Sequence, residues 1–283
     1  MWCRTNFAPK PAGIPSRPVL RDSHRQGYAP VSRKHHCVDE QGVALVYDSN
    51  SRERQRELSV LCRIVEVLAA VVPNGIVCFF ASYNFLQKFR AVFEQSPEKV
   101  NVLKTKALFF ETQEKGKTIF AEYSKQAFSK GAILFAVYGG SQSEGVDFAD
   151  GLARLVLLVG QPYPPDGIKL QLRRDYFRSR SALQLELPKQ RREIYATLAN
   201  EIKTILCYKS INQSIGRAMR HKDDYAAIVL LDARYTDARA QRLLPCYVTQ
   251  ALQNTSEHGN KAFSRNVLKN NLTEFYRFQN KRT

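Results

Sequence analysis

Short runs of apolar residues alternate along the chain with longer segments in which apolar residues recur every three or four positions. Continuous apolar runs of about four to eight residues are typical of buried strands, and recurrence at three and four is typical of helices with one buried face. We expect six of the runs to form strands, at residues 43–47, 76–80, 107–111, 132–137, 155–160 and 226–231.

Helical spacing is found between these runs and after them. One apolar face runs from Leu58 to Val72 and ends at the turn residues 73–75, and a second helix passes through Phe85 and Phe93. Helical spacing resumes over 194–205. Beyond residue 237 the chain is polar, and we expect helices there with these residues available for docking: Phe263, Leu268, Leu272, Phe275 and Phe278.

The alternation of strands and helices predicts an α/β fold with a mainly parallel central sheet flanked by helices. Residues 1–42 contain scattered prolines among basic residues and no apolar period, so we expect a disordered basic leader. Residues 43–236 would form the α/β lobe, and residues 237–283 a C-terminal helical extension.

Composition adds a basic charge balance to this picture. The formal net charge is +17 over 283 residues, which favours a polyanionic partner. No apolar run reaches the roughly 18 residues that a membrane span needs, so we expect none. The six cysteines form no C-x-x-C pair, and we interpret them as reduced thiols rather than a disulfide framework or a metal site.

A basic motif lies just before the last predicted strand. Residues 211–221 read INQSIGRAMRH and contain the pattern Q-x-x-G-R-x-x-R. On a helix, Gln213, Arg217 and Arg220 would lie four and three residues apart and share one face. Paired arginine forks suit phosphate binding, and Gly216 would permit close approach of another backbone or a ligand. The alternative is an exposed basic helix, which the fixed Gln and Gly make less favourable.

A glycine-rich polar loop separates two predicted strands. It reads YGGSQSEGVDF over residues 138–148, between the runs at 132–137 and 155–160. In open α/β sheets, loops at the carboxyl ends of strands are where ligands bind. The loop is therefore a second candidate for a functional site.

The segment 162–222 is the most basic part of the chain, with 13 Lys and Arg against five Asp and Glu, a net charge of +8. Arginines interleaved with aromatic rings suit single-stranded nucleic acid, because bases stack on the rings and phosphates bind the arginines. The alternative is a solvated helix with buried aromatic residues. The residues concerned are Arg173, Arg174, Tyr176, Phe177, Arg178 and Arg180.

Three short matches to known sites fail on their context. The acidic pair at 39–40 does not follow an apolar strand, and the adjacent His-His-Cys at 35–37 cannot readily converge on one ion. Gly-Lys-Thr at 116–118 resembles the end of a P-loop, but that motif needs a glycine where this chain has Glu111, and a strand leading straight into the loop. We therefore expect no metal site.

The glycine-rich loop, VGQPYP at 159–164 and QSIGRAMRH at 213–221 together resemble motifs V and VI of the XPD-like DNA helicases. These are superfamily-2, DEAH-box, iron–sulfur helicases, and the resemblance is strongest to the branch linked to sister-chromatid cohesion. It covers about residues 43–235, with the motifs in the family's order and spacing. The resemblance implies a single RecA-like lobe of the P-loop-NTPase type, the second motor lobe of such a helicase.

The resemblance also implies a mechanism in which ATP binds between two lobes. Arg220, and with it Arg217, would reach the γ-phosphate from this side, and Gln213 would help to place the attacking water or the phosphate. The motif V residues would link the nucleotide cleft to the nucleic-acid track. The implied nucleotide-binding residues are Glu144, Gly145, Asp147 and Gly216.

The same family uses motif IV, a strand-to-helix turn, to hold nucleic acid. Ser82 and Tyr83 occupy the matching positions, and a helix is implied over 118–128. From chemistry alone, a helix cap at Ser82 and a packed Tyr83 carry equal weight. The implied nucleic-acid-binding residues are Ser82, Tyr83, Arg173, Arg174 and Arg178.

By resemblance, the cofactors would be ATP and Mg²⁺ shared with a first lobe, the substrate single-stranded or forked DNA, the direction 5′ to 3′, and the location nuclear. The chain has no G-x-x-x-x-G-K-[ST], no strand-borne Asp-Glu-x-His and no four-cysteine cluster for the family's iron–sulfur centre. We therefore expect no ATP hydrolysis without a first RecA-like lobe, in a longer chain or in trans. Two alternatives are a non-catalytic nucleic-acid-binding or regulatory remnant and an RNA-directed superfamily-2 ATPase.

Overall fold

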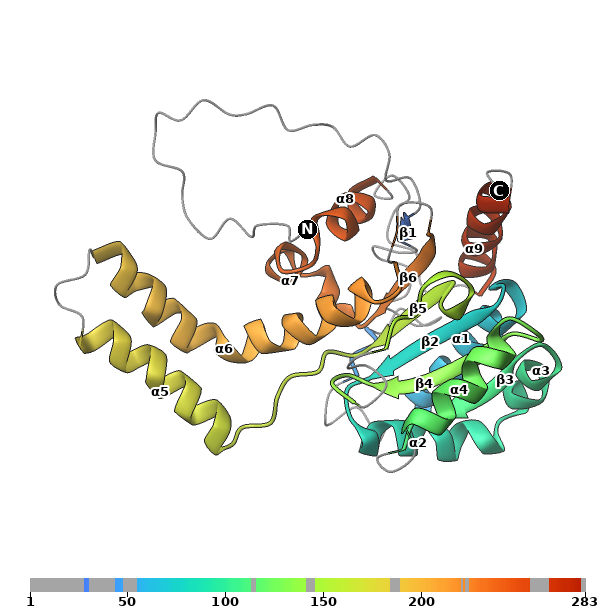
Figure 1. Ribbon diagram of the computed structural model, residues 1–283, viewed down its shortest axis with the longest axis horizontal. Coiled ribbons are helices and arrows are strands. Elements are labelled where there is room, and N and C mark those ends of the chain that lie inside the picture. The colour runs from blue at the N-terminus through green and yellow to red at the C-terminus, as the bar shows by residue number, and fades with distance from the viewer. Residues whose placement is uncertain are drawn as a thin grey trace.

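The computed structural model describes residues 28–30, 44–47, 55–112, 116–140, 146–183, 189–219, 221, 224–254 and 265–280. Within these ranges, parallel strands form one sheet, and helices cover both of its faces (Figure 1). The α/β class and the parallel sheet that the sequence predicted are confirmed.

The sheet has the strand order β1-β6-β5-β2-β4-β3. Its short edge strand β1 (Tyr28–Pro30) pairs with β6 and falls inside the predicted leader, whose other residues lie outside the described part of the chain. The extent of the leader therefore stays a prediction. The five longer strands are β2 (Gly75–Phe80), β3 (Ala107–Phe110), β4 (Ala132–Val137), β5 (Leu155–Val159) and β6 (Ala226–Leu231).

The pleat of the sheet sends alternate side chains into two separate cores. In β2, Cys78 and Phe80 belong to one core, whereas Val77 and Phe79 belong to the other. The first core is closed by α1 (Gln55–Val71), α2 (Tyr83–Gln95), α3 (Pro97–Thr105) and α9 (Arg265–Asn280). The second is closed by α4 (Gly116–Ala127), the carboxyl end of α6 (Lys189–Gly216), α7 (Ala238–Arg242) and α8 (Cys246–Asn254).

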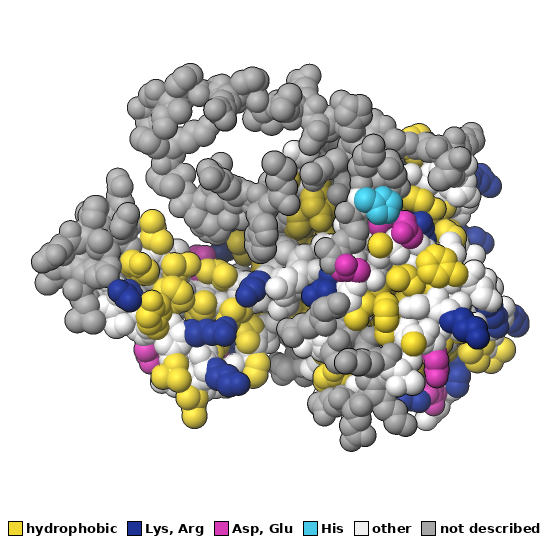
Figure 2. Space-filling model, viewed as in Figure 1, with side chains coloured by type: hydrophobic (Ala, Val, Ile, Leu, Met, Phe, Trp, Pro, Cys, Tyr) yellow, Lys and Arg dark blue, Asp and Glu magenta, His cyan; other side chains and the backbone are white. Residues whose placement is uncertain are grey.

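A helical hairpin extends away from the sheet (Figure 1). It is formed by α5 (Ile168–Leu183) and the amino-terminal part of α6, and its inner face includes the buried Leu170 and a stack of Phe177 on Tyr195. Apolar side chains gather on the visible surface of the hairpin (Figure 2). We call one row of them, at steps of four along α5, the outer stripe: Ile168, Leu172 and Tyr176, which are 76%, 63% and 53% exposed.

The strand expected at 43–47 is wrong. Of the run at 43–47, the described residues 44–47 contain only an isolated bridge at Ala44 and no strand. This run is apolar because Leu45 and Tyr47 are buried next to the end of β6, where the Leu45 carbonyl accepts from the Ala233 amide at 2.7 Å. In α9, the expected docking residues Leu268, Leu272 and Phe275 are buried, whereas Phe278 is 51% exposed, and Phe263 lies outside the described residues.

Candidate functional site

The turn after β2 uses Ser82 and Tyr83 for local structure. Ser82 caps α2, with its hydroxyl accepting a hydrogen bond from the Phe85 amide at 3.2 Å. Tyr83 begins the helix, is partly buried, and donates its hydroxyl to Glu111 Oε1 at 3.1 Å. The structural interpretation of both residues is therefore present in the molecule, and their role in nucleic-acid binding stays a prediction.

Glu111 was missed as a site residue by sequence reasoning. It follows β3 and is only 3% exposed, and its second oxygen accepts from the Val137 amide at 2.8 Å. Glu111 therefore connects the end of β4 to the start of α2. The sequence signal that could have revealed it is an acidic residue directly after an apolar run, at the carboxyl end of a predicted strand.

The position of Glu111 also bears on the rejected P-loop. Strand β3 is followed along the chain by helix α4, in the order that the motif requires. The match still fails at position 111, because a glutamate stands where the motif needs glycine, and its carboxylate binds Tyr83 and Val137. A carboxylate there would repel phosphates rather than hold them.

The loop after β4 begins with a buried aromatic residue. Tyr138 stacks on Phe79 with ring centroids 5.6 Å apart, and burial raises the pKa of its phenol well above the usual value. Glu144 and Gly145, which the resemblance assigns to nucleotide binding, lie outside the described residues. Val146, the first described residue after them, is partly buried, and Asp147 is exposed.

Motifs V and VI are joined by two hydrogen bonds. Arg217 Nη1 donates to the Val146 carbonyl at 2.9 Å, and the Phe148 amide donates to the Arg217 carbonyl at 3.0 Å. Phe148 is 1% exposed and packs edge-on against Phe79 and Tyr123. The structure therefore brings Asp147, between Val146 and Phe148, next to the arginine motif.

We expected the residues of the arginine motif to share one helical face, and this expectation is wrong. Helix α6 ends at Gly216, and Arg217 lies in the turn that follows, so Arg217 leaves the helical face of the exposed Gln213. Arg220 lies outside the described residues. A Cβ placed on Gly216 would meet no atom of the described residues within 4 Å, so none of them makes the close approach that the glycine permits.

A group of charged residues connects this turn to β6. Asp224 Oδ1 accepts from Arg154 Nη1 at 2.8 Å, Asp224 Oδ2 accepts from the Asp150 amide at 3.3 Å, and His221 Nε2 lies 3.0 Å from Asp150 Oδ1. Ligand atoms of Asp150, His221 and Asp224 lie within 4.8 Å of one another, a spacing that could hold a metal ion. However, the Asp224 carboxylate is already neutralised by Arg154, so we assign no metal there.

These contacts lie at opposite ends of the strands, which we call the carboxyl edge and the amino edge of the sheet. Tyr83 and Glu111 follow β2 and β3, at the carboxyl ends of the strands. Asp224 precedes β6, and the Arg154 amide donates to the carbonyl of Gly75, the first residue of β2, at 2.9 Å. Residues 138–154 therefore run from the carboxyl edge, where motif IV lies, to the amino edge, where motif VI lies.

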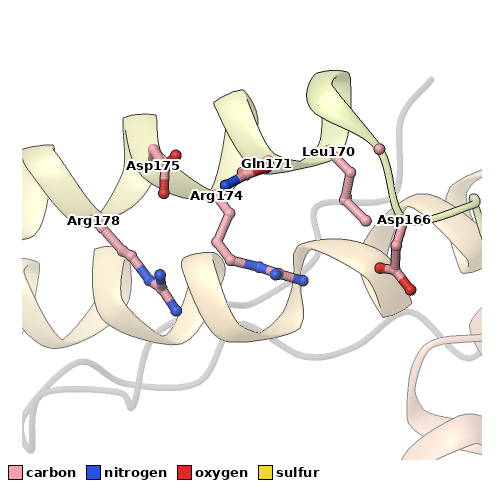
Figure 3. Close-up of a pocket in the computed structure, with 7 residues that line it drawn as sticks. Asp166, Leu170, Gln171, Arg174, Asp175 and Arg178 are labelled. Carbon is pink, nitrogen blue, oxygen red and sulfur yellow. The ribbon is translucent and has the colours of Figure 1, made fainter.

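The predicted nucleic-acid-binding arginines all lie on α5 of the hairpin, but they do not all line the same pocket. Arg174 and Arg178 line a pocket of about 320 Å³ beside α6, whereas Arg173 does not line it (Figure 3). At the base of the hairpin, Lys203 hydrogen-bonds Asp166 at 2.7 Å and lowers the pKa of that carboxyl. The remaining residues of the pocket are Asp166, Gly167, Leu170, Gln171 and Asp175.

The aromatic residues of this segment are only partly buried. Tyr176 is 53% exposed, with the Arg180 guanidinium 5.4 Å from its ring centroid, while Phe177 is partly covered by α6. The alternative of a helix with both rings buried is therefore wrong for Tyr176. In the described ranges, no helix is long and apolar enough to cross a membrane.

A parallel sheet covered on both faces, with motif V held against a Q-x-x-G-R turn that leads into β6, defines the carboxyl-terminal lobe of a helicase. The chain belongs to the helicase C-terminal domain family, whose model matches residues 65–251. The predicted resemblance to XPD-like helicases is thereby confirmed.

Two relatives illustrate the match. The chain is 32% identical to the ATP-dependent DNA helicase chl1 of Schizosaccharomyces pombe, over 77% of this chain and 26% of that protein. It is 34% identical to the ATP-dependent DNA helicase chl-1 of Caenorhabditis elegans, over 76% of this chain and 24% of that protein. The chain thus spans about a quarter of the length of these relatives.

A solved structure described as an apo form of XPD shares the fold. It matches with a TM-score of 0.51 and 18% identity, over 74% of this chain and 38% of that chain.

Proposed function

We propose that this chain is the second motor lobe of an ATP-dependent DNA helicase of the cohesion-linked, XPD-like branch. The observation that carries the proposal is the double hydrogen bond between Arg217 and the motif V residues Val146 and Phe148. It binds the end of the glycine-rich loop to the arginine turn, so a force on either segment is passed to the other. A two-lobed motor needs such a link between its nucleotide cleft and its nucleic-acid track.

On the nucleotide side, ATP and Mg²⁺ would be held mainly by a first lobe, with this lobe facing the phosphates. The buried Nε of Arg217 has no hydrogen-bond partner in the described part of the chain, which fits a guanidinium placed for an anion. Because one arm of Arg217 is committed to Val146, we assign the arginine finger to Arg220. Gln213 would position the attacking water, while Gly216, Glu144, Gly145 and Asp147 would line the cleft.

On the nucleic-acid side, single-stranded or forked DNA would bind Ser82, Tyr83 and the arginines of the hairpin. Exposed Tyr176 beside Arg180 supports this assignment, because bases stack on exposed rings and phosphates bind arginines. By resemblance to the XPD-like family, the motor would move from 5′ to 3′ and would act in the nucleus in chromatid cohesion. An iron–sulfur cluster would belong to the first lobe of a complete helicase.

Arg220 provides the decisive test. Phosphoryl transfer places negative charge on the γ-phosphate oxygens, and an arginine finger is worth about 10³ to 10⁵ in rate. With a first lobe supplied in trans or in a longer chain, Arg220→Ala should lose ATP hydrolysis by that order while retaining DNA binding. Arg220→Lys should rescue little, because lysine lacks the planar fork. Arg277→Ala, at an exposed arginine of α9, is the matched control.

The outcomes separate the proposal from its alternatives. If Arg220→Ala hydrolyses ATP within a few-fold of the parent, or loses DNA binding together with hydrolysis, the finger assignment is wrong. A parent assembly that binds DNA but hydrolyses no ATP would favour a non-catalytic remnant. Binding and stimulation by RNA alone would favour an RNA-directed ATPase.

A further inference from the structure

The carboxylate of Glu111 joins two elements that carry predicted functional residues. The Glu111 amide donates to the Phe135 carbonyl at 2.8 Å, which fixes the backbone of this residue beside β4. Its two carboxylate oxygens then diverge, Oε1 to the Tyr83 hydroxyl at 3.1 Å and Oε2 to the Val137 amide at 2.8 Å. One buried side chain therefore holds the start of α2 and the end of β4 together.

The turn that follows β4 closes over this carboxylate. The Gly140 amide donates to the Val137 carbonyl at 2.9 Å. A Cβ on Gly140 would lie 2.6 and 2.9 Å from the two oxygens of Glu111 and 2.9 Å from the Tyr83 hydroxyl. Such distances are shorter than van der Waals contact, so no residue with a side chain fits without displacing the carboxylate. The glycine at 140 is thus explained by the approach of Glu111.

We propose that Glu111 is a positioning residue that couples nucleic-acid contact at Tyr83 to the motif V loop. The inference rests on the proposed function and deepens it. A shift of the Tyr83 ring on nucleic-acid binding pulls on Glu111 Oε1, and Oε2 passes the shift to Val137, where the loop begins. At its far end, the loop is bonded through Val146 and Phe148 to Arg217.

The chemistry of the side chain allows both contacts at once. A carboxylate accepts from both donors simultaneously. Glutamine at this position can accept from Val137 through its oxygen and donate to the Tyr83 hydroxyl through its amide nitrogen, so it keeps the connection. Leucine keeps the volume but breaks both contacts and leaves the buried Val137 amide without an acceptor.

Hydrogen exchange measured by mass spectrometry tests the coupling on the chain itself. In the parent, oligo(dT) should slow the exchange of amides in peptides covering 137–148. Glu111→Gln should preserve this protection, whereas Glu111→Leu and Tyr83→Phe should reduce it by more than half. Without DNA, Glu111→Leu should exchange these amides about tenfold faster, from the loss of one hydrogen bond to a charged acceptor. Glu94→Leu, at an exposed position of α2, is the control.

Exchange in α9 reports whether a variant is folded, and exchange in 137–148 reports the coupling. Unchanged exchange in peptides from α9 shows that a variant is folded, and if Glu111→Leu unfolds, Tyr83→Phe decides. Parent-like DNA protection of 137–148 in Tyr83→Phe and in any folded Glu111→Leu would overturn the coupling. A parent that does not bind oligo(dT) would refute the proposed nucleic-acid function instead. In that case, unchanged exchange without DNA in Glu111→Leu, or in Tyr83→Phe if the leucine variant unfolds, would also overturn the positioning role.

Discussion

The ion pair between Asp224 and Arg154 should dominate the stability of the amino edge of the sheet. The Asp224 side chain is 0% exposed and that of Arg154 is 13% exposed, so both charges are largely removed from water. Asp224 also accepts from the Tyr225 amide at 2.9 Å and from the Asp150 amide at 3.3 Å. Replacing Asp224 with alanine leaves a buried guanidinium without its counter-charge and two amides without an acceptor.

The expected loss can be placed within a narrow range. Removing one partner of a buried pair costs about 3–5 kcal/mol. Arg154 would retain the Tyr225 carbonyl at 3.0 Å and the Tyr225 ring, whose centroid lies 4.0 Å from the guanidinium carbon. These remaining contacts put Asp224→Ala near the lower end, about 3 kcal/mol. Asp224→Asn keeps an oxygen acceptor and should lose about 1–2 kcal/mol.

Equilibrium urea unfolding, followed by far-ultraviolet circular dichroism, measures these losses as changes in midpoint at constant slope. Glu94→Gln is the control, because it breaks an exposed pair with Arg90 that should contribute about 0.3–0.5 kcal/mol. A loss below about 1 kcal/mol for Asp224→Ala, or one equal to that of the control, would refute the reasoning from burial.

Three further predictions follow from burial and helix geometry. Gly216→Ala should leave the chain as stable or up to about 1 kcal/mol more stable by thermal unfolding, because a Cβ there meets no atom of the residues that the structure describes. In the assembled helicase the same change should lower ATP hydrolysis, and equal activity would show that nothing approaches this glycine. Burial lowers the pKa of Lys106 to about 8, so the charged lysine destabilises the fold below pH 8 and this cost disappears as pH rises toward its usual 10.5. Lys106→Met should remove this dependence. In plots of unfolding free energy against pH, the parent should therefore rise more steeply than the variant between about pH 8 and 10.5, by at most about 1.4 kcal/mol per pH unit. Parallel plots for the two proteins would contradict the prediction. Iodoacetamide should label exposed Cys246 in the native chain but not three buried thiols, whose pKa values burial raises: Cys62, Cys78 and Cys207. Rapid labelling of any of these three thiols would contradict their burial.

The salt dependence of DNA binding tests the hairpin arginines. Each phosphate contact on a single strand contributes about −0.7 to the slope of log affinity against log salt. Replacing Arg173, Arg174 and Arg178 by glutamine should therefore make the slope shallower by about 2 in fluorescence anisotropy titrations with oligo(dT). A triple variant at exposed Lys125, Lys269 and Arg277 is the matched control. Equal slopes for both variants would place the strand elsewhere.

The main elements could be predicted from the sequence because burial on both faces leaves a continuous apolar run. The run at 132–137 became β4 with both bounds correct, and 226–231 became β6. The run at 43–47 is equally apolar, but its described residues 44–47 pack past the end of the sheet, where the Tyr47 amide donates to Asp232 Oδ2 at 3.0 Å. Helix α3 was missed, because it buries only Val102 and has no strong apolar period.

The site was predictable where its residues are close in sequence and unpredictable where they are not. The arginine motif and the glycine-rich loop could be read from spacing, although the end of α6 before Arg217 could not. The bonds from Glu111 to Tyr83 and from Arg154 to Asp224 join residues 28 and 70 positions apart. Neither bond leaves a periodic signal, because one buried polar group among apolar residues does not reveal its partner.

The outer stripe of α5 has a practical consequence for handling this lobe. The stripe is a row of exposed apolar side chains on a projecting hairpin, and contiguous exposed apolar surface favours association between molecules. Concentrated solutions of the separate lobe would therefore tend to cluster through α5 despite the repulsion of a +17 charge. Salt would worsen the clustering by screening that repulsion. A single Leu172→Glu change should keep the lobe dispersed, since position 172 lies outside the hairpin's inner face.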